Sequence, residues 1–230
     1  MNIGIIGAGA IGGTLAAKLV KLGHTVSIAN SRGPDSLKEV AARTGATPVT
    51  ANQAARAGEV VILSIPQVNV PGLPGDLFEG VAPNVVVIDT NNYYPKLRDG
   101  DIAPKDGIDS QWVADHIRRS VVKVFNNIYA NSLATKGAVK GTPARLALPV
   151  SGDDPRAKQI VLGLVDALGF DPIDAGTIAE SWRQQPGTPC YCHDFDRPTM
   201  AQALAAADRH KTALYRDEAE QAALKFLASR

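Results

Sequence analysis

The start of the chain constrains the fold more than any other stretch, because it reads as a strand, a glycine-rich turn and a helix. The run NIGII (2–6) is short, apolar and β-branched, which is typical of a buried strand. The next six residues fit G-x-G-x-x-G and open an amphipathic helix. In that context Gly7 permits a tight turn, Gly9 lets backbone approach a pyrophosphate, and Gly12 lets helix and strand pack closely. The stretch therefore predicts a dinucleotide site at the positive end of the helix. It is made by Gly7, Ala8, Gly9, Ala10, Ile11 and Gly12.

The end of the second predicted strand indicates which dinucleotide binds. TVSIA (25–29) is followed by Asn30, Ser31 and Arg32, whereas NAD sites carry an Asp or Glu about 20 residues after the fingerprint. An acid there would repel a 2′-phosphate. Asn30 and Ser31 remove that repulsion, and the guanidinium of Arg32 matches a phosphate. We expect NADP(H) as the cofactor; a solvated loop residue is the alternative interpretation of Arg32.

Strands alternate with helices along most of the chain, which indicates a parallel sheet covered by helices on both faces. We expect an α/β fold, a Rossmann-type doubly wound parallel sheet with a further βαβ unit and a C-terminal helical segment. The predicted division is a Rossmann domain over residues 1–142 and a C-terminal βαβ with a helical extension over 143–230. Residues 91–119 are polar and rich in turn formers, so irregular structure is expected there. Further strands are predicted at 46–50, 59–66, 83–90, 120–125, 144–150 and 170–176.

Polar residues gather just past the carboxyl ends of three predicted strands, where open α/β sheets bind their ligands. LSIP (63–66) follows one strand, DTNNYYP (89–95) the next and VFNNIYA (124–130) a third. Turn formation by asparagine is the alternative interpretation of the two Asn pairs. The predicted cofactor contacts at this edge are Ser64, Ile65, Pro66 and Asn91. The predicted substrate contacts are Asn92, Tyr93, Asn126 and Asn127.

Other patterns carry less weight. Lys123 and Asn127 have the K-x-x-x-N spacing that related hydroxyacid dehydrogenases use on a helix, but here the run is β-branched, and residues four apart do not meet on a strand. The cluster CYCHD (190–194) lacks the second ligand pair of a zinc site, so no metal is expected. No catalytic acid–base constellation is evident, and no catalytic side chain is predicted.

Composition narrows the partners. A net charge of +1 does not create the positive electrostatic potential that attracts nucleic acid or an anionic membrane. No apolar run approaches the 18 or so residues of a membrane span. Two cysteines are too few for a disulfide framework. We expect a cytoplasmic protein whose partner is a small-molecule hydride acceptor, with a homodimer left open.

Several of these stretches together resemble the NADP oxidoreductase, coenzyme F420-dependent family. They are IGIIGAGAIGGTLAAKLVKLGHTVSIANSRGP, LSIP, VVVIDTNNYYP, VVKVFNNI and LPVSGDDPRAKQIVLGLVDALGFDPIDAG. The first part is also similar to the cytosolic domain of the six-transmembrane ferric reductases (STEAP). The family resemblance implies reversible hydride transfer between NADPH and the deazaflavin F420. It also implies 2′-phosphate contacts at Ser31 and Arg32 and pyrophosphate contacts at Ala8, Gly9, Ala10 and Ile11. From Trp182 onward the sequence departs from the apolar C-terminal segment expected of the deazaflavin enzyme.

Three functions remain open on the sequence. The first is an NADPH-dependent reductase of a deazaflavin or a flavin. The second is a reductase of another small molecule, such as a carbonyl or an imine, although relatives of that kind usually add a longer helical domain. The third is an NADPH-binding sensor that interacts with a partner without turnover.

Overall fold

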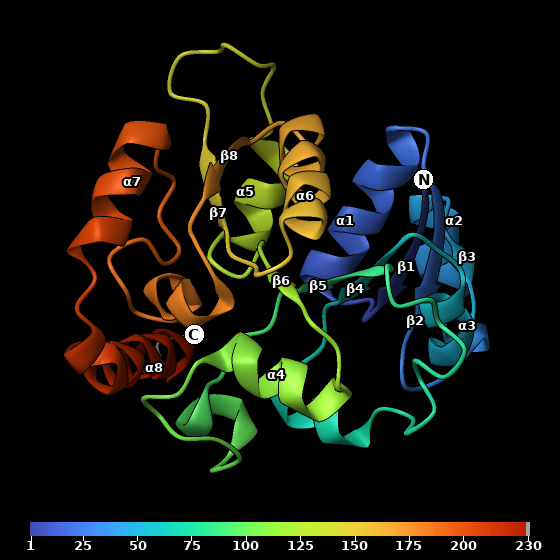
Figure 1. Cartoon of the computed structure of the whole chain (residues 1–230), viewed down its shortest axis with the longest axis horizontal. Helices are drawn as coiled ribbons and strands as arrows, with labels where there is room; N and C mark the ends of the chain where they lie inside the picture. The colour runs from blue at the N-terminus through green and yellow to red at the C-terminus, as the bar shows by residue number, and fades with distance from the viewer. Residues whose placement is uncertain (229–230) are drawn as a thin grey trace.

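The computed structural model describes residues 1–228, and a six-stranded parallel sheet forms its centre (Figure 1). The strand order is β3-β2-β1-β4-β5-β6, which is the order of a doubly wound dinucleotide-binding fold. The predicted fold class is therefore confirmed. The strands are β1 (Asn2–Ile6), β2 (Thr25–Ala29), β3 (Thr47–Pro48), β4 (Val60–Leu63), β5 (Val86–Asp89) and β6 (Val122–Lys123).

The central strands are apolar on both faces because helices cover both sides of the sheet. Along β4, Val60 and Ile62 belong to one buried cluster, and Val61 and Leu63 belong to the other. Alternate residues of a strand point to opposite faces, so two cores form, one above and one below the sheet. Fully burying one such side chain contributes about 1.5–3 kcal/mol.

The helices divide between the two faces as these clusters indicate. Side chains from α1, α2, α5 and α6 enter the first cluster, and side chains from α3 and α4 enter the second. The helices are α1 (Ala10–Lys21), α2 (Lys38–Thr44), α3 (Ala51–Arg56), α4 (Asp109–Ile117), α5 (Ala130–Thr135), α6 (Pro155–Ala167), α7 (Arg197–Ala206) and α8 (Thr212–Ala228). Short 3₁₀ turns occupy Pro34–Leu37, Gln67–Gly72, Ile178–Gln184 and Arg209–Lys211, and Pro95–Asp99 is a π-helical turn.

A second, two-stranded parallel sheet is formed by β7 (Ala147–Val150) and β8 (Asp171–Asp174), which α6 connects. This is the further βαβ unit expected from the sequence. It meets the main sheet at one antiparallel bridge, where the amides of Lys123 and Ser151 bond each other's carbonyls at 2.8 and 3.1 Å. The first apolar cluster continues without a break into α6 and β7. The domain boundary at residue 142 stays a prediction.

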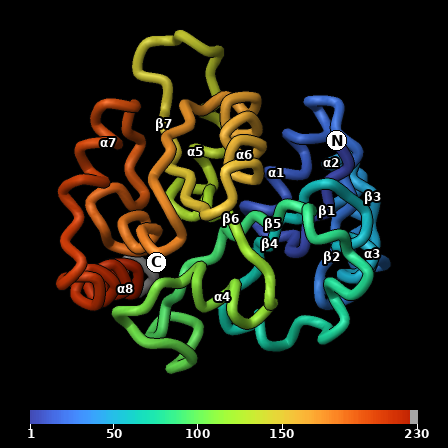
Figure 2. The backbone as a smooth tube through the Cα atoms, in the orientation of Figure 1, coloured from blue at the N-terminus to red at the C-terminus, as the bar shows by residue number. Residues whose placement is uncertain are grey.

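The stretch from 91 to 119 is more ordered than its polar composition indicates, because it contains the π-helical turn and α4. The C-terminal helices α7 and α8 lie at the opposite side of the molecule from β3 (Figures 1 and 2). α8 lies beside the π-helical turn, so the last helix contacts a segment that leaves the sheet at β5. None of the described helices combines the length and the apolar character needed to cross a membrane.

Candidate functional site

The three fingerprint glycines occupy three different environments. A Cβ on Gly7, whose φ is +116°, would lie 2.0 Å from the carbonyl oxygen of Ser64. A Cβ on Gly12 would lie 2.0 Å from the carbonyl oxygen of Gly7, whereas one on Gly9 would meet nothing within 4 Å. Gly7 and Gly12 are therefore needed for the close approach of β1, β4 and α1. Gly9 faces open space, as the approach of a pyrophosphate requires.

The first turn of α1 offers free backbone N–H groups to this open space. Gly9 is the N-cap, no side chain caps the helix, and its first turn has no acidic residue. The first N–H groups of a helix have no partner within it, and the dipole there favours an anion. Ala8, Gly9 and Ala10 line a cleft of about 690 Å³. Ile11 is half-buried against the first apolar cluster.

Arg43 at the end of α2 is a candidate contact that the sequence did not single out. It lines the same cleft, and its Nη2 would be 3.6 Å from a Cβ on Gly13. Lys18 lines the cleft as well. Neither cation has an ion-pair partner among the described residues. Periodicity along α2 could have placed Arg43 on a helix but not on the side that meets α1.

The loop after β2 is shaped by Asn30. Its Oδ1 accepts a hydrogen bond from the backbone N–H of Arg32 at 3.0 Å, and its Nδ2 donates to Ser36 Oγ at 2.9 Å. Ser31 and Arg32 are exposed. Asn30 therefore holds the loop, and the side chains of Ser31 and Arg32 remain accessible to a ligand.

The exit of β4 lies beside the fingerprint. Ser64, Ile65 and Pro66 are half-buried, and the amide of Ser64 donates to the carbonyl of Ile6 at 2.8 Å. The next residue, Gln67, was not singled out from the sequence. It is fully buried, and neither its amide nitrogen nor its amide oxygen has a partner within the described protein.

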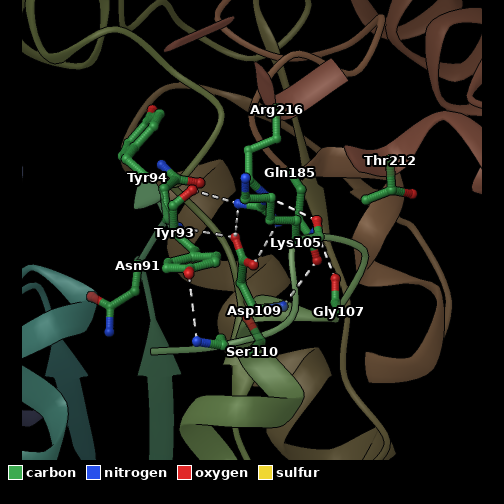
Figure 3. A network of polar contacts seen from close by, with 12 residues as sticks. Asn91, Tyr93, Tyr94, Lys105, Gly107, Asp109, Ser110, Gln185, Thr212 and Arg216 are labelled. Carbon is green, nitrogen blue, oxygen red and sulfur yellow. Dashed lines mark hydrogen bonds and ion pairs between the residues drawn. The ribbon is translucent and has the colours of Figure 1, made fainter. Parts of the chain in front are cut away.

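Two further buried amides lack hydrogen-bond partners within the described chain, those of Asn91 after β5 and Asn127 after β6. They are 2% and 0% exposed, and both side-chain amides are unpartnered among the described residues. Figure 3 shows the side chain of Asn91 turned away from Asp109 and Arg216. An unpaired buried polar group costs about 1–3 kcal/mol. Three such amides at the ends of β4, β5 and β6 thus form an edge fitted for a polar ligand.

Asn92 and Asn126 are instead bonded to each other. Asn126 Nδ2 donates to Asn92 Oδ1 at 3.1 Å, and Asn92 Nδ2 donates to the carbonyl of Asn126 at 2.8 Å. Gln184 extends this pairing, because its Nε2 donates to Asn126 Oδ1 at 2.9 Å and its Oε1 accepts from Ser151 at 3.0 Å. The pair fixes the spacing of the loops after β5 and β6.

The structure separates Tyr93 from the other predicted substrate contacts. Its side chain is 0% exposed, and its hydroxyl donates to the carbonyl of Gly100 at 2.8 Å. Arg216 of α8 donates to the Tyr93 carbonyl and pairs with Asp109 at 2.9 Å, as Figure 3 shows. Tyr93 thus anchors the 93–109 segment to α8, because its ring points into that segment and not over the sheet edge.

Lys123 lies in β6 and is fully buried, so its amine is not free to act with Asn127. Its Nζ donates to the Asn91 carbonyl at 2.9 Å and to Ser110 Oγ at 2.8 Å, and lies 3.7 Å from Asp89 Oδ2. Asp89 is its register partner in β5. Burial raises the pKa of Asp89, and the positive charge of Lys123 opposes that shift. This ion pair joins the two strands below the site.

A pair of tyrosines, also missed by the sequence interpretation, lies beside Asn92. Asn92 Nδ2 donates to the hydroxyl of Tyr191 at 3.3 Å, and that hydroxyl is bonded to the hydroxyl of Tyr94. Burial raises the pKa of Tyr94 to about 12 and raises the pKa of Tyr191 well above its ordinary value.

Cys190 and Cys192 are free thiols. The described residues contain no group of three His, Cys, Asp or Glu side chains that could hold a metal.

Comparison with known proteins agrees with this geometry. Residues 2–93 match the model of the family described as NADP oxidoreductase, coenzyme F420-dependent. The protein YjhV of Escherichia coli (strain K12) is 50% identical over 70 residues, which are 30% of this chain and 51% of that protein. The match therefore spans about half the length of that relative.

Two solved structures extend the likeness to most of the chain. The hypothetical protein SMa0349 from Sinorhizobium meliloti is 34% identical with a TM-score of 0.70, over 84% of this chain and 94% of that one. A protein from Arthrobacter sp. FB24, described as an F420-dependent NADP-reductase, shares the fold at 22% identity. Its TM-score is 0.63, over 78% of this chain and 86% of that one. Residues 2–93 therefore belong to the NADP oxidoreductase, coenzyme F420-dependent family.

Proposed function

We propose that this protein transfers a hydride between NADP(H) and a planar ring acceptor of the deazaflavin or flavin class. The observation that carries the proposal is the row of unpartnered amides of Gln67, Asn91 and Asn127 at the ends of three neighbouring strands. Each amide has a donor and an acceptor. The carboxamide of nicotinamide and the carbonyl and imide edge of a flavin-type ring have the same two kinds of group.

The other half of the site fits the phosphates of NADP(H). The open face of Gly9 and the uncapped start of α1 suit the pyrophosphate. The exposed Ser31 and Arg32 suit a 2′-phosphate. When bound, NADPH supplies a hydride from C4 of its nicotinamide. The residues of this chain need to hold two rings in contact and exclude water, which requires few reactive side chains.

The decisive experiment compares an unpartnered amide with a partnered one. NADPH oxidation is followed at neutral pH with F420, riboflavin, FMN, redox dyes and a set of carbonyl compounds and imines. Asn127→Leu should lower kcat/KM for the best ring acceptor about tenfold, or about 1.4 kcal/mol. It should not lower thermal stability, because it removes an unpaired buried amide. Asn126→Leu should lose stability by about 1–3 kcal/mol, because it leaves buried partners without a bond.

The outcomes separate the three candidate functions. Turnover with a ring acceptor and loss in Asn127→Leu support the proposal. Turnover with carbonyls or imines alone would replace it with a small-molecule reductase. Tight NADPH binding without turnover for any acceptor would favour a sensor.

We also propose that the protein acts in the cytoplasm on a diffusible acceptor, without a nucleic-acid or membrane partner, since its net charge is only +1. A homodimer is the proposed assembly. Light scattering at several protein concentrations would contradict it by giving a single mass near 24.2 kDa.

A further inference from the structure

Tyr191 belongs to a loop far along the chain, but its contacts place it over the exits of β5 and β6. Its hydroxyl accepts from Asn92 Nδ2 at 3.3 Å, and the same nitrogen donates to the carbonyl of Asn126 at 2.8 Å. The next residue, Cys192, donates its backbone N–H to the carbonyl of Asn127 at 2.9 Å. The phenol is therefore tied to both asparagine loops that the proposed function assigns to the acceptor.

The backbone beside Tyr191 is held in a strained conformation. Cys192 has a φ of +55°, which costs a non-glycine residue about 1–3 kcal/mol and persists only where surrounding contacts determine it. The bond from Cys192 to Asn127 is one such contact. Strain of this kind concentrates at functional sites, and here it lies next to the residue whose phenol contacts Asn92 and Tyr94.

Tyr94 is the hydrogen-bond partner of Tyr191. The two hydroxyls are bonded to each other, and both residues are partly exposed. The guanidinium of Arg98 lies 5.3 Å from the centre of the Tyr94 ring and would stabilise negative charge on its oxygen. Burial raises the pKa of both tyrosines, so both carry a proton at neutral pH. The two phenols thus form a chain of two hydrogen-bonded hydroxyls that begins at Asn92 on the sheet edge.

We propose that Tyr191 is a catalytic residue that hydrogen-bonds a heteroatom of the acceptor and gives it a proton during hydride transfer. This rests on the proposed function. The acceptor gains two electrons with the hydride of NADPH, and the neutral reduced product also needs one proton. The O–H bond of Tyr191 breaks as the heteroatom–H bond forms. Tyr94 returns a proton to Tyr191, and water returns one to Tyr94, so both phenols end as they began.

This role narrows the class of acceptor. Such a substrate has a carbon that accepts the hydride, conjugated to a ring nitrogen or a carbonyl oxygen that accepts the proton. Deazaflavins have both, because C5 accepts the hydride and the conjugated pyrimidinedione ring accepts the proton, and flavins differ only in accepting the hydride at the nitrogen N5. A ferric chelate takes up electrons without a proton, so Tyr191 would have no part in its reduction.

The test compares Tyr191→Phe with Tyr129→Phe. Tyr129 is 55% exposed, and its hydroxyl makes no hydrogen bond within the described chain, so it is a matched control. Tyr191→Phe should lower kcat with F420 or riboflavin about 100-fold. It should alter the solvent deuterium isotope effect on kcat and leave the dissociation constant of NADPH within about twofold, or about 0.4 kcal/mol. Reduction of a ferric chelate, if any occurs, should be unchanged.

Binding gives a second readout that does not depend on turnover. With NADP⁺ present, quenching of riboflavin or deazaflavin fluorescence should show weaker acceptor binding to Tyr191→Phe by about fivefold, and no change in Tyr129→Phe. An active wild type whose Tyr191→Phe variant keeps its kcat, isotope effect and acceptor affinity would overturn the role of Tyr191 and leave the proposed function standing. A wild type that reduces no ring acceptor would overturn both.

Discussion

The two halves of the proposed site are built from different parts of the chain. The phosphate half uses mostly backbone, namely glycines without side chains and free N–H groups at the start of α1, together with the side chains of a short loop after β2, all within residues 7–43. The acceptor half uses side chains, and Tyr191 and Gln184 reach Asn92 and Asn126 across 99 and 58 residues. A backbone site is determined by neighbouring residues, whereas a side-chain site depends on the packing of the whole C-terminal segment.

The largest expected effect is on the buried Arg216–Asp109 ion pair, which joins α8 to the segment after β5. Arg216→Met should lower the free energy of unfolding by about 3–5 kcal/mol, because it leaves the Asp109 carboxylate buried without its counter-charge. Urea denaturation monitored by circular dichroism measures this. Lys211→Met is the control, since its exposed pair with Asp208 at 3.9 Å contributes about 0–1 kcal/mol. A loss as small as that of the control would show that α8 does not fix the 93–109 segment.

The next effect tests the phosphate half alone. Gly9→Val should weaken NADPH binding at least about 100-fold, or about 2.7 kcal/mol, because the valine side chain occupies the space a pyrophosphate needs. The fold should remain, since a Cβ at this position meets no protein atom within 4 Å. Fluorescence titration measures the affinity. Gly163→Val, also in open space but on α6, is the control. Normal affinity in Gly9→Val would place the cofactor elsewhere.

A smaller effect separates the two phosphate groups of the cofactor. Arg32→Ala should weaken NADPH about tenfold, or about 1.4 kcal/mol, and leave NADH unchanged, because only NADPH has a 2′-phosphate. Arg43→Ala is the informative comparison: it should weaken both cofactors alike if Arg43 meets the pyrophosphate. Calorimetric titration with each cofactor measures these constants. Equal losses of NADPH and NADH affinity in Arg32→Ala would contradict a 2′-phosphate contact.

The smallest effect concerns the loop that carries Arg32. Asn30→Ala should weaken NADPH about threefold, or about 0.65 kcal/mol, because Asn30 acts on the loop through Arg32 and Ser36. The same titration measures it, with Ser36→Ala as the control that removes the contacts of Asn30 with Ser36 and keeps the bond from the Arg32 amide to Asn30 Oδ1. A loss as large as that of Arg32→Ala would instead mean that Asn30 contacts the cofactor itself.

The phosphate half of the proposed site could be predicted from the sequence more completely than the acceptor half. The doubly wound parallel fold and the need for glycine at Gly7 and Gly12 follow from local patterns, because a tight turn and a close approach leave glycine as the residue that fits. The positions of Asn91, Asn92, Asn126 and Asn127 at the sheet edge also followed, since strand ends are visible in sequence. Which of these amides pair with each other did not, because that depends on side-chain direction. Only the three-dimensional structure shows that Asn92 pairs with Asn126 and that the amides of Asn91 and Asn127 stay unpaired among the described residues.

The tyrosines show the limit most clearly. Tyr93 and Tyr94 are equivalent in sequence terms, yet Tyr93 turns toward Gly100 and Arg216 and Tyr94 turns toward Tyr191. The partners that decide this, Arg216 and Tyr191, lie 123 and 97 residues further on, beyond the residues that the family model matches. Lys123 was assigned correctly to a strand, but its burial against Asp89 depends on the pairing of β5 with β6.

The contacts of α8 with residues far earlier in the chain affect the order in which parts of the protein can fold during synthesis. Arg216 bonds Asp109 across 107 residues, and Glu220 accepts from the amide of Lys96 across 124. Chains emerge from the ribosome N-terminus first, and their early parts begin to fold at once. The Rossmann half can close around NADP(H) while synthesis continues. The segment beyond β5 gains the counter-charge of its buried Asp109 carboxylate only when the last helix has been made, so the acceptor half of the proposed site is the last part to be completed.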